Sequence, residues 1–186
     1  MVDRRKLLGG MLALPFAGRA LAQAPALPLT PACGKPPALT ARQTEGPYYT
    51  ADTPKRDNFV EPGAKAERLL LEGFVLSTRC AGVAQAMLDV WHCDENGQYD
   101  NTGYRYRGHL FTDAHGRYRL ETIVPALYPG RARHIHLRVQ APGRKMLTTQ
   151  VYFPGDPGNE RDWIWKRELE IRREGGRGRC DFVVDA

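Results

Sequence analysis

Apolar and polar residues alternate with a period of two along most of the chain after Arg68. Because successive side chains of a β-strand point to opposite faces of a sheet, this alternation predicts strands rather than helices. Turn-forming groups such as Asn96-Gly97 and Ala141-Pro-Gly143 separate the runs. Seven runs show the pattern, namely 69–76, 86–93, 104–112, 117–123, 134–140, 147–153 and 180–184. They predict an all-β sandwich of about seven to nine short strands with long functional loops, with one short helical turn within residues 163–170.

The first 22 residues are typical of an export signal. Arg4 and Arg5 precede the apolar stretch 9–16, and Ala20-Leu21-Ala22 offers small residues to a signal peptidase. The alternative of a membrane anchor is disfavoured, because a spanning helix needs ~20 apolar residues. We therefore expect a twin-arginine-type signal at 1–22, an irregular N-terminal arm at 23–47 and a single domain at 48–186. The protein would then be exported to the periplasm or the extracellular space.

The basic character of the chain suggests nucleic-acid binding only at first sight. The formal net charge is +6. The signal segment contains four basic residues and one acidic residue, so its removal lowers the net charge to +3. The remaining arginines are interleaved with acids or aromatics, as in Arg172-Arg173-Glu174, which is usual for a solvated strand face. We therefore expect no nucleic-acid partner and no stable membrane insertion after signal removal.

The four cysteines of the chain, in an exported protein, predict two disulfides rather than a thiolate metal site. Three pairings are open. Cys80 and Cys93 flank a stretch that suits one hairpin arm, and Cys33 and Cys180 lie near the two ends of the mature chain, so we favour 80–93 with 33–180.

One predicted strand, 134–140, carries two histidines on a single face. Ile135, Leu137 and Val139 share the other face and are expected to belong to the core. Two imidazoles that are two residues apart in a strand point the same way, so they could offer two nitrogen ligands to one metal ion. Such pairs are often incidental, and the spacing alone does not establish a metal site.

Motifs elsewhere in the chain carry a resemblance to a known family. Tyr128-Pro-Gly-Arg131 directly precedes the histidine strand, and Leu147-Thr-Thr-Gln150 opens the next strand. The segments 90–99, which ends Asn-Gly-Gln-Tyr99, and 44–49, which reads Thr-Glu-Gly-Pro-Tyr-Tyr, come earlier in the chain. As an ordered set these motifs resemble the intradiol ring-cleavage dioxygenases, non-haem iron enzymes that open catechols between their two hydroxyls. The resemblance also implies a prealbumin-like form of the β-sandwich.

The resemblance implies a metal site whose ligands are Tyr99, Tyr128, His134 and His136. In that family the corresponding two tyrosines and two histidines bind one iron(III). The chemistry is consistent, because a bound trivalent cation strongly favours the ionised phenol and because anionic oxygen donors prefer iron(III) over iron(II). The implied cofactor is therefore Fe(3+).

The resemblance further implies the residues that act on the substrate. Arg131 would stabilise the carbanion-like form of the bound catecholate, and Gln150 would form hydrogen bonds near the iron. Tyr128 would be displaced by the catechol and would take up one of its protons. Arg133 is a competitor for the arginine role, although it lies on the strand face opposite to the histidines.

The implied partners are a small aromatic diol and O2, and the implied product is a muconate-type diacid. The loop between Tyr128 and Arg131 is shorter than in the well-known cytosolic members, and the N-terminal helical region of the catechol and hydroxyquinol enzymes is replaced by the arm. The substrate-contacting residues of those enzymes therefore do not transfer, and the choice of catechol stays open. Tyr48 and Tyr49 are candidates for lining the pocket, and a homo-oligomer is compatible with the sequence.

Two other functions are compatible with the same residues. The first is a non-catalytic exported β-sandwich binding module. Loss of any of the four ligands from the sequence would indicate this function. The second is a zinc or copper hydrolase that uses His134 and His136. A hydrolase needs a carboxylate as third ligand and general base, and Asp100 beside Tyr99 is the candidate.

Overall fold

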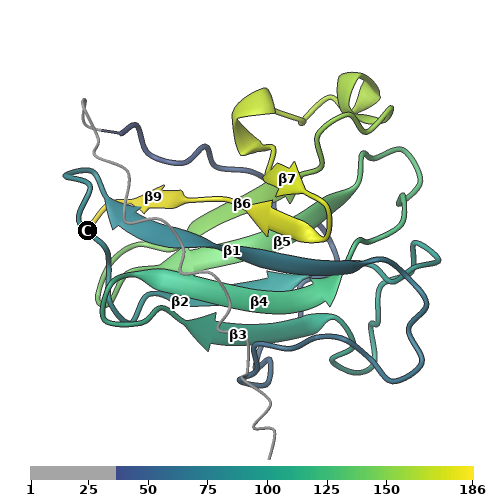
Figure 1. Ribbon diagram of the computed structural model, residues 1–186, viewed down its shortest axis with the longest axis horizontal. Helices are drawn as coiled ribbons and strands as arrows, with labels where there is room; N and C mark the ends of the chain where they lie inside the picture. Colours follow the sequence, from purple (N-terminus) through teal and green to yellow (C-terminus); the bar gives the residue numbers. More distant parts are fainter. Residues whose placement is uncertain (1–36) are drawn as a thin grey trace, which may run out of the picture.

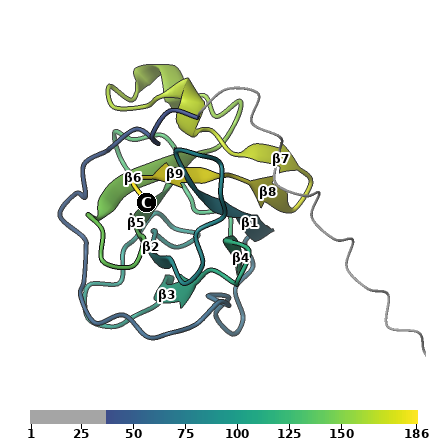
Figure 2. The same cartoon turned by 90° about the vertical axis from the view of Figure 1, so that its left-hand side faces the viewer.

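A computed structural model describes residues 37–186, which form two β-sheets packed face to face (Figures 1 and 2). The all-β sandwich is confirmed. The described part of the chain contains β1 (Arg68–Ser77), β2 (Met87–Trp91), β3 (Arg107–Phe111), β4 (Arg117–Ile123), β5 (His134–Gln140), β6 (Leu147–Tyr152), the 3₁₀-helices η1 (Asn159–Arg161) and η2 (Arg167–Leu169), β7 (Arg172–Glu174), β8 (Arg177–Arg179) and β9 (Phe182–Val184).

The first sheet is organised around the long strand β1. Its order is β4-β1-β8-β7, and β9 also pairs with β1, while the second sheet has the order β3-β2-β5-β6. The first half of β1 pairs in parallel with β8 and its second half with β9. A Cβ atom at Gly73 would lie 1.8 Å from the carbonyl oxygen of Cys180, which connects β8 to β9. Gly73 therefore permits the close approach of this connection to the middle of β1.

The core lies between the two sheets and follows the period-two pattern. Leu71 and Val75 of β1 face Ile135, Leu137 and Val139 of β5, and all five are fully buried. The burial of this apolar surface is the main contribution that favours folding. It also fixes the register of β5, because a shift by one residue would turn the histidines into the core.

Several predicted strands are a few residues shorter or longer in the structure, and other elements differ more. The strand predicted at 104–112 begins only at Arg107, because Tyr106 adopts a left-handed conformation (φ 52°). The β7–β8 hairpin was not predicted, although Gly175-Gly176 between two short runs is a hairpin signal. The helical turn expected within 163–170 is present as η2, and η1 precedes it.

The N-terminal arm is described only from residue 37. Residues 37–47 contain no strand or helix, but they run beside β6, where the amide of Gln43 donates to the oxygen of Thr148 (2.9 Å). Figure 2 shows the following segment, drawn in blue, passing along the outside of the second sheet. The predicted signal at 1–22 and most of the arm lie outside the described residues, so both stay predictions. Within residues 37–186, no helix has the length and apolar character needed to cross a membrane.

The prediction of two disulfides is wrong, and so is the favoured pairing. Cys93 and Cys180 carry free thiols, whereas Cys80 is disulfide-bonded. Neither the 80–93 nor the 33–180 disulfide therefore forms. Cys93 lies at the end of β2, where its Sγ donates to the carbonyl oxygen of Ala126 (3.4 Å). The remaining cysteine of the chain, Cys33, lies outside the described residues.

Thiol titration of denatured, non-reduced protein should therefore give two reactive groups per chain. In the folded protein both should react slowly, because burial raises the pKa of Cys93 and of Cys180 to about 12 and so keeps the thiols protonated at neutral pH. A result of no thiols after denaturation would show that these two cysteines are also oxidised.

Candidate metal centre

The two histidines of β5 lie on the outer face of their sheet, yet each is only 3% exposed. The segment 44–49 covers them so closely that a Cβ atom at Gly46 would lie 3.5 Å from Cε1 of His136. On the other side, the ring of His136 stacks on Trp91 of the neighbouring strand, with 4.9 Å between the ring centres. The site is thus a covered pocket on the outside of the sandwich rather than part of its core.

The ring nitrogens of the histidines converge on one point. Nε2 of His134 and Nε2 of His136 are 3.1 Å apart. Nδ1 of His134 lies 2.6 Å from the carbonyl oxygen of Ala132, which only accepts, so Nδ1 carries the proton and Nε2 keeps its lone pair. Two nitrogens bound to one ion at about 2.1 Å and at a right angle would be about 3 Å apart. The separation therefore fits joint binding of one cation.

Tyr99 brings an oxygen to the same point. It follows a turn in which the carboxylate of Asp94 accepts from the amides of Asn96 (2.8 Å) and Gln98 (2.9 Å), and Gly97 takes a positive φ of 77°. This turn places the Tyr99 hydroxyl 3.1 Å from Nε2 of His134. Three of the four predicted ligands are therefore in direct contact.

Tyr128, the fourth predicted ligand, lies beside this group but has a different hydrogen-bond partner. Its ring is 5.7 Å from that of Tyr99, and its hydroxyl lies 2.6 Å from the hydroxyl of Tyr48. Tyr48 itself stacks on Tyr99, with 4.5 Å between the ring centres. Tyr49 instead packs on the side of Trp91 and donates to Asp89 (2.9 Å). Of the two candidate pocket tyrosines, Tyr48 therefore lies in the cluster.

The electrostatics of the cluster favour a bound cation. Burial lowers the pKa of His134 to about 4 and that of His136 well below its usual value, so both imidazoles are neutral at physiological pH. Burial raises the pKa of Tyr99, although Arg131 opposes this increase. A cation at the point where the three donor atoms meet would reverse the burial effect on Tyr99 and allow its phenol to ionise. Two nitrogen and two phenol oxygen donors suit a trivalent iron ion.

Arg131 and Gln150 form one network next to the cluster. The Arg131 guanidinium donates to Gln150 through Nη2 (2.7 Å) and to the buried carboxylate of Asp162 through Nε (2.9 Å). Gln150 is fully buried, and it lies opposite His136 in the pairing of β5 with β6. Its Nε2 donates to the carbonyl oxygen of Thr44 (2.8 Å). Both predicted residues therefore lie at the site.

Tyr152 and Asp162, which were not predicted from the sequence, also belong to this network. Tyr152 contacts Arg131 (3.3 Å) and donates to Gln150 (3.1 Å). Asp162 accepts from Arg131 and from the amide of Ala132 (3.1 Å), whose carbonyl orients His134. Neither belongs to a recognisable motif. Only the position of Tyr152 two residues after Gln150 on the same strand face could have indicated its role.

Replacing Asp162 with asparagine should lower the kcat of the iron-loaded protein by about 10- to 100-fold, the usual range for groups that support a metal site from behind its ligands. Asparagine keeps the shape but removes the charge that holds Arg131, so KM should change less than kcat and iron content should persist. Steady-state kinetics with metal analysis measure this. Asp156→Asn is the matched control, because that aspartate is also buried but pairs with Arg133 (3.4 Å). An equal loss in both variants would contradict the positioning role.

Two other residues predicted from the sequence have their partners outside the cluster. Arg133, the competitor of Arg131, is paired with Asp156 and is 40% exposed at its side chain. Asp100 accepts from the amides of Thr102 and Gly103 within its own turn. Among the described residues, no group of three His, Cys, Asp or Glu side chains is placed to hold a metal. The hydrolase therefore lacks its carboxylate ligand in this part of the chain.

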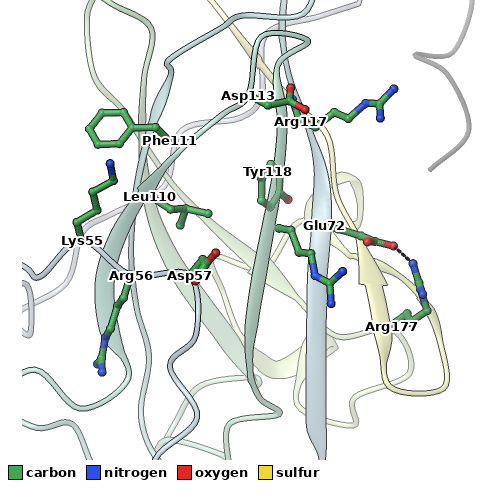
Figure 3. A pocket seen from close by; sticks show the side chains of 11 residues that line it. Lys55, Arg56, Asp57, Glu72, Leu110, Phe111, Asp113, Arg117, Tyr118 and Arg177 are labelled. Carbon is green, nitrogen blue, oxygen red and sulfur yellow. Dashed lines mark hydrogen bonds and ion pairs between the residues drawn. The ribbon is translucent and has the colours of Figure 1, made fainter. Parts of the chain in front are cut away.

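A cavity of about 660 Å³ lies elsewhere, at the open edge between β3 and β4 (Figure 3). It contains none of the predicted site residues. Figure 3 shows Lys55 beside the ring of Phe111 on one side and the ion pair of Arg177 with Glu72 (2.6 Å) on the other. Its charges are of both signs, and it offers no convergent donor set comparable to the histidine cluster.

The fold and the cluster together define a β-sandwich with a histidine and tyrosine centre suited to a metal ion. Comparison with known proteins agrees. The family model described as Dioxygenase matches residues 44–169. In the catechol 1,2-dioxygenase of Pseudomonas sp. (strain EST1001), 29% of residues are identical over 165 residues, which cover 74% of this chain and 55% of that protein. The hydroxyquinol 1,2-dioxygenase of Rhodococcus opacus is 33% identical over 140 residues, which cover 62% of this chain and 47% of that protein.

Solved structures give the same result. The dioxygenase domain of a dioxygenase carbohydrate-binding protein fusion from Streptomyces sp. SirexAA-E superposes with a TM-score of 0.77 at 44% identity, covering 80% of this chain and 99% of that one. The hydroxyquinol 1,2-dioxygenase of Pseudomonas putida DLL-E4 superposes with a TM-score of 0.73 at 25% identity, covering 80% and 67%. The chain belongs to the intradiol ring-cleavage dioxygenase family. It spans about half the length of the curated relatives it matches.

Proposed function

We propose that the protein is a non-haem iron(III) dioxygenase that cleaves a catechol-type aromatic between its two hydroxyls with O2, giving a muconate-type diacid. The observation that carries the proposal is the convergence of Nε2 of His134, Nε2 of His136 and the hydroxyl of Tyr99 within 3.1 Å contacts, with Tyr128 beside them. Bound there, a ferric ion would supply a Lewis acid for the two catechol oxygens.

The two phenols of the site have different environments and therefore different roles. Tyr99 contacts His134, so its hydroxyl already lies against the histidine nitrogens. Tyr128 bonds through its hydroxyl to Tyr48, so an alternative partner is ready when a substrate displaces it. Tyr128 is then the residue that takes up a proton from an incoming catechol hydroxyl.

Arg131 supplies a positive charge beside the cluster. Its guanidinium is fixed by Asp162 and Gln150 and contacts neither histidine, so it is available for negative charge that develops on the ring. A fixed charge of this kind stabilises a transition state without needing to reorganise. Trp91 and the 44–49 segment cover the histidines and limit the access of water.

The proposal is tested by the reaction of the iron-loaded protein with unsubstituted catechol. Oxygen uptake should accompany formation of a ring-opened diacid, identified by mass spectrometry, without the aldehyde-bearing product of extradiol cleavage. If iron-loaded protein leaves catechol, hydroxyquinol and dihydroxybenzoate all unchanged, the proposal is wrong, and the binding-module alternative gains support.

A further inference from the structure

A second cavity, of about 530 Å³, opens beside Tyr128 and Arg131. From these two residues it passes over Pro129 and Gly130 to Pro157, Gly158 and Arg161. Gly130 has a positive φ of 80°, and no atom of the described residues lies within 4 Å of the place where its Cβ would be. The loop therefore leaves this part of the cavity open. The volume falls in the range of about 300–1,000 Å³ usual for small-molecule sites, which is more room than a single catechol ring needs.

The walls of this cavity are apolar and its one available charge is positive. Leu127, 45% exposed, lines it together with Pro129 and Pro157. Among residues 37–186, no acidic side chain lines it. Arg131 is already engaged by Asp162, whereas Arg161 is exposed and has no side-chain partner among residues 37–186. Arg161 is therefore the cation that is free to meet a ligand.

The backbone of Arg161 belongs to the loop that fixes Arg131. Its amide donates to the oxygen of Gly158 (3.0 Å), and the amide of the next residue, Asp162, donates to the same oxygen (3.0 Å). Asp162 is bonded to Arg131. Nearby, the side-chain amide of Asn159 is buried and donates to the oxygen of Phe153 (2.9 Å). The subsite and the proposed reaction centre thus share one anchored segment.

We infer that this cavity is a substrate subsite, and that the protein takes catechols whose ring substituent carries a carboxylate several bonds from the ring. The apolar walls would contact the spacer, and Arg161 would pair with the carboxylate. This inference rests on the proposed function, because the catechol ring is placed at the cluster. Arg161 would act in specificity, not in the chemical step.

The test compares 3-(3,4-dihydroxyphenyl)propanoate with its neutral methyl ester and with unsubstituted catechol, using iron-loaded protein. Wild type should prefer the free acid to the ester. Arg161→Gln should lower kcat/KM for the acid by about three- to five-fold, because an exposed ion pair contributes about that much. The loss should raise KM and leave kcat unchanged. The values for the ester and for catechol should not change. Added salt should reduce the preference of wild type.

Arg167→Gln is the matched control, because Arg167 is exposed on the neighbouring η2 and does not line the cavity. Binding of the unreactive 3-(4-hydroxyphenyl)propanoate, measured by calorimetry, tests the subsite without turnover and should be weaker only in Arg161→Gln. Equal binding by wild type and Arg161→Gln, or equal losses for acid and ester, would overturn the subsite. If unsubstituted catechol is still cleaved normally, such a result leaves the proposed function intact. Wild type that binds the acid through Arg161 but cleaves no catechol would refute the proposed function, and the cavity would then be a binding site for the acid rather than a substrate subsite.

Discussion

Replacing Arg131 with alanine should lower kcat by about 10²–10³-fold, the range seen when one preorganised electrostatic donor is removed. Iron content and colour should persist, because Arg131 contacts Gln150, Asp162 and Tyr152 but neither histidine. Steady-state kinetics and metal analysis on the same sample measure both quantities. Full turnover by Arg131→Ala would move the charge-stabilising role to another cation.

Two further variants separate charge from folding in this experiment. Removing Arg131 leaves the carboxylate of Asp162 buried without its partner, and such changes cost about 3–5 kcal/mol of stability. Arg131→Lys keeps a positive charge beside that carboxylate but not the planar guanidinium, so it should regain stability more than kcat. Arg133→Ala should keep wild-type kcat, because Arg133 pairs with Asp156 away from the cluster.

Replacing Tyr99 with phenylalanine should remove most of the iron and the visible absorption, and should lower activity by at least about 100-fold. Tyr99 provides the oxygen that contacts His134. Removing a ligand should lower activity more than removing a residue that only hydrogen-bonds to a ligand, which costs about 10- to 100-fold. Metal analysis and absorption spectra measure the loss.

Tyr48→Phe is the control for this variant. It removes a hydroxyl from the ring that stacks on Tyr99 but leaves all four predicted ligands in place. Iron content should therefore stay close to that of wild type. If Tyr99→Phe also keeps its iron and colour, Tyr99 is not a ligand and the assignment of the site fails.

The strands were predictable because their pattern is local. In β5 the alternation of Ile135, Leu137 and Val139 with the histidines specifies both the strand and its buried face, and the structure confirms both. The cysteine pairing was not predictable, because spacing along the chain does not determine which thiols meet in space. Cys93 and Cys180 lie at well-separated places in the sequence and carry free thiols.

The residues of the candidate site that belong to sequence motifs were predictable. The resemblance named Tyr99, Tyr128 and the two histidines, and the structure brings three of them into contact and places Tyr128 beside them. Asp162 could not be found in this way. It lies in an irregular loop 31 residues from Arg131, and only the tertiary fold brings the two together.

Metal analysis combined with the visible spectrum of the purified wild-type protein, expressed with ample iron, tests the central claim most directly. Two tyrosines and two histidines at one ferric ion predict about one iron per chain and a tyrosinate-to-iron charge-transfer band that colours the protein red to burgundy. Colourless protein that binds zinc in preference to iron would contradict the claim.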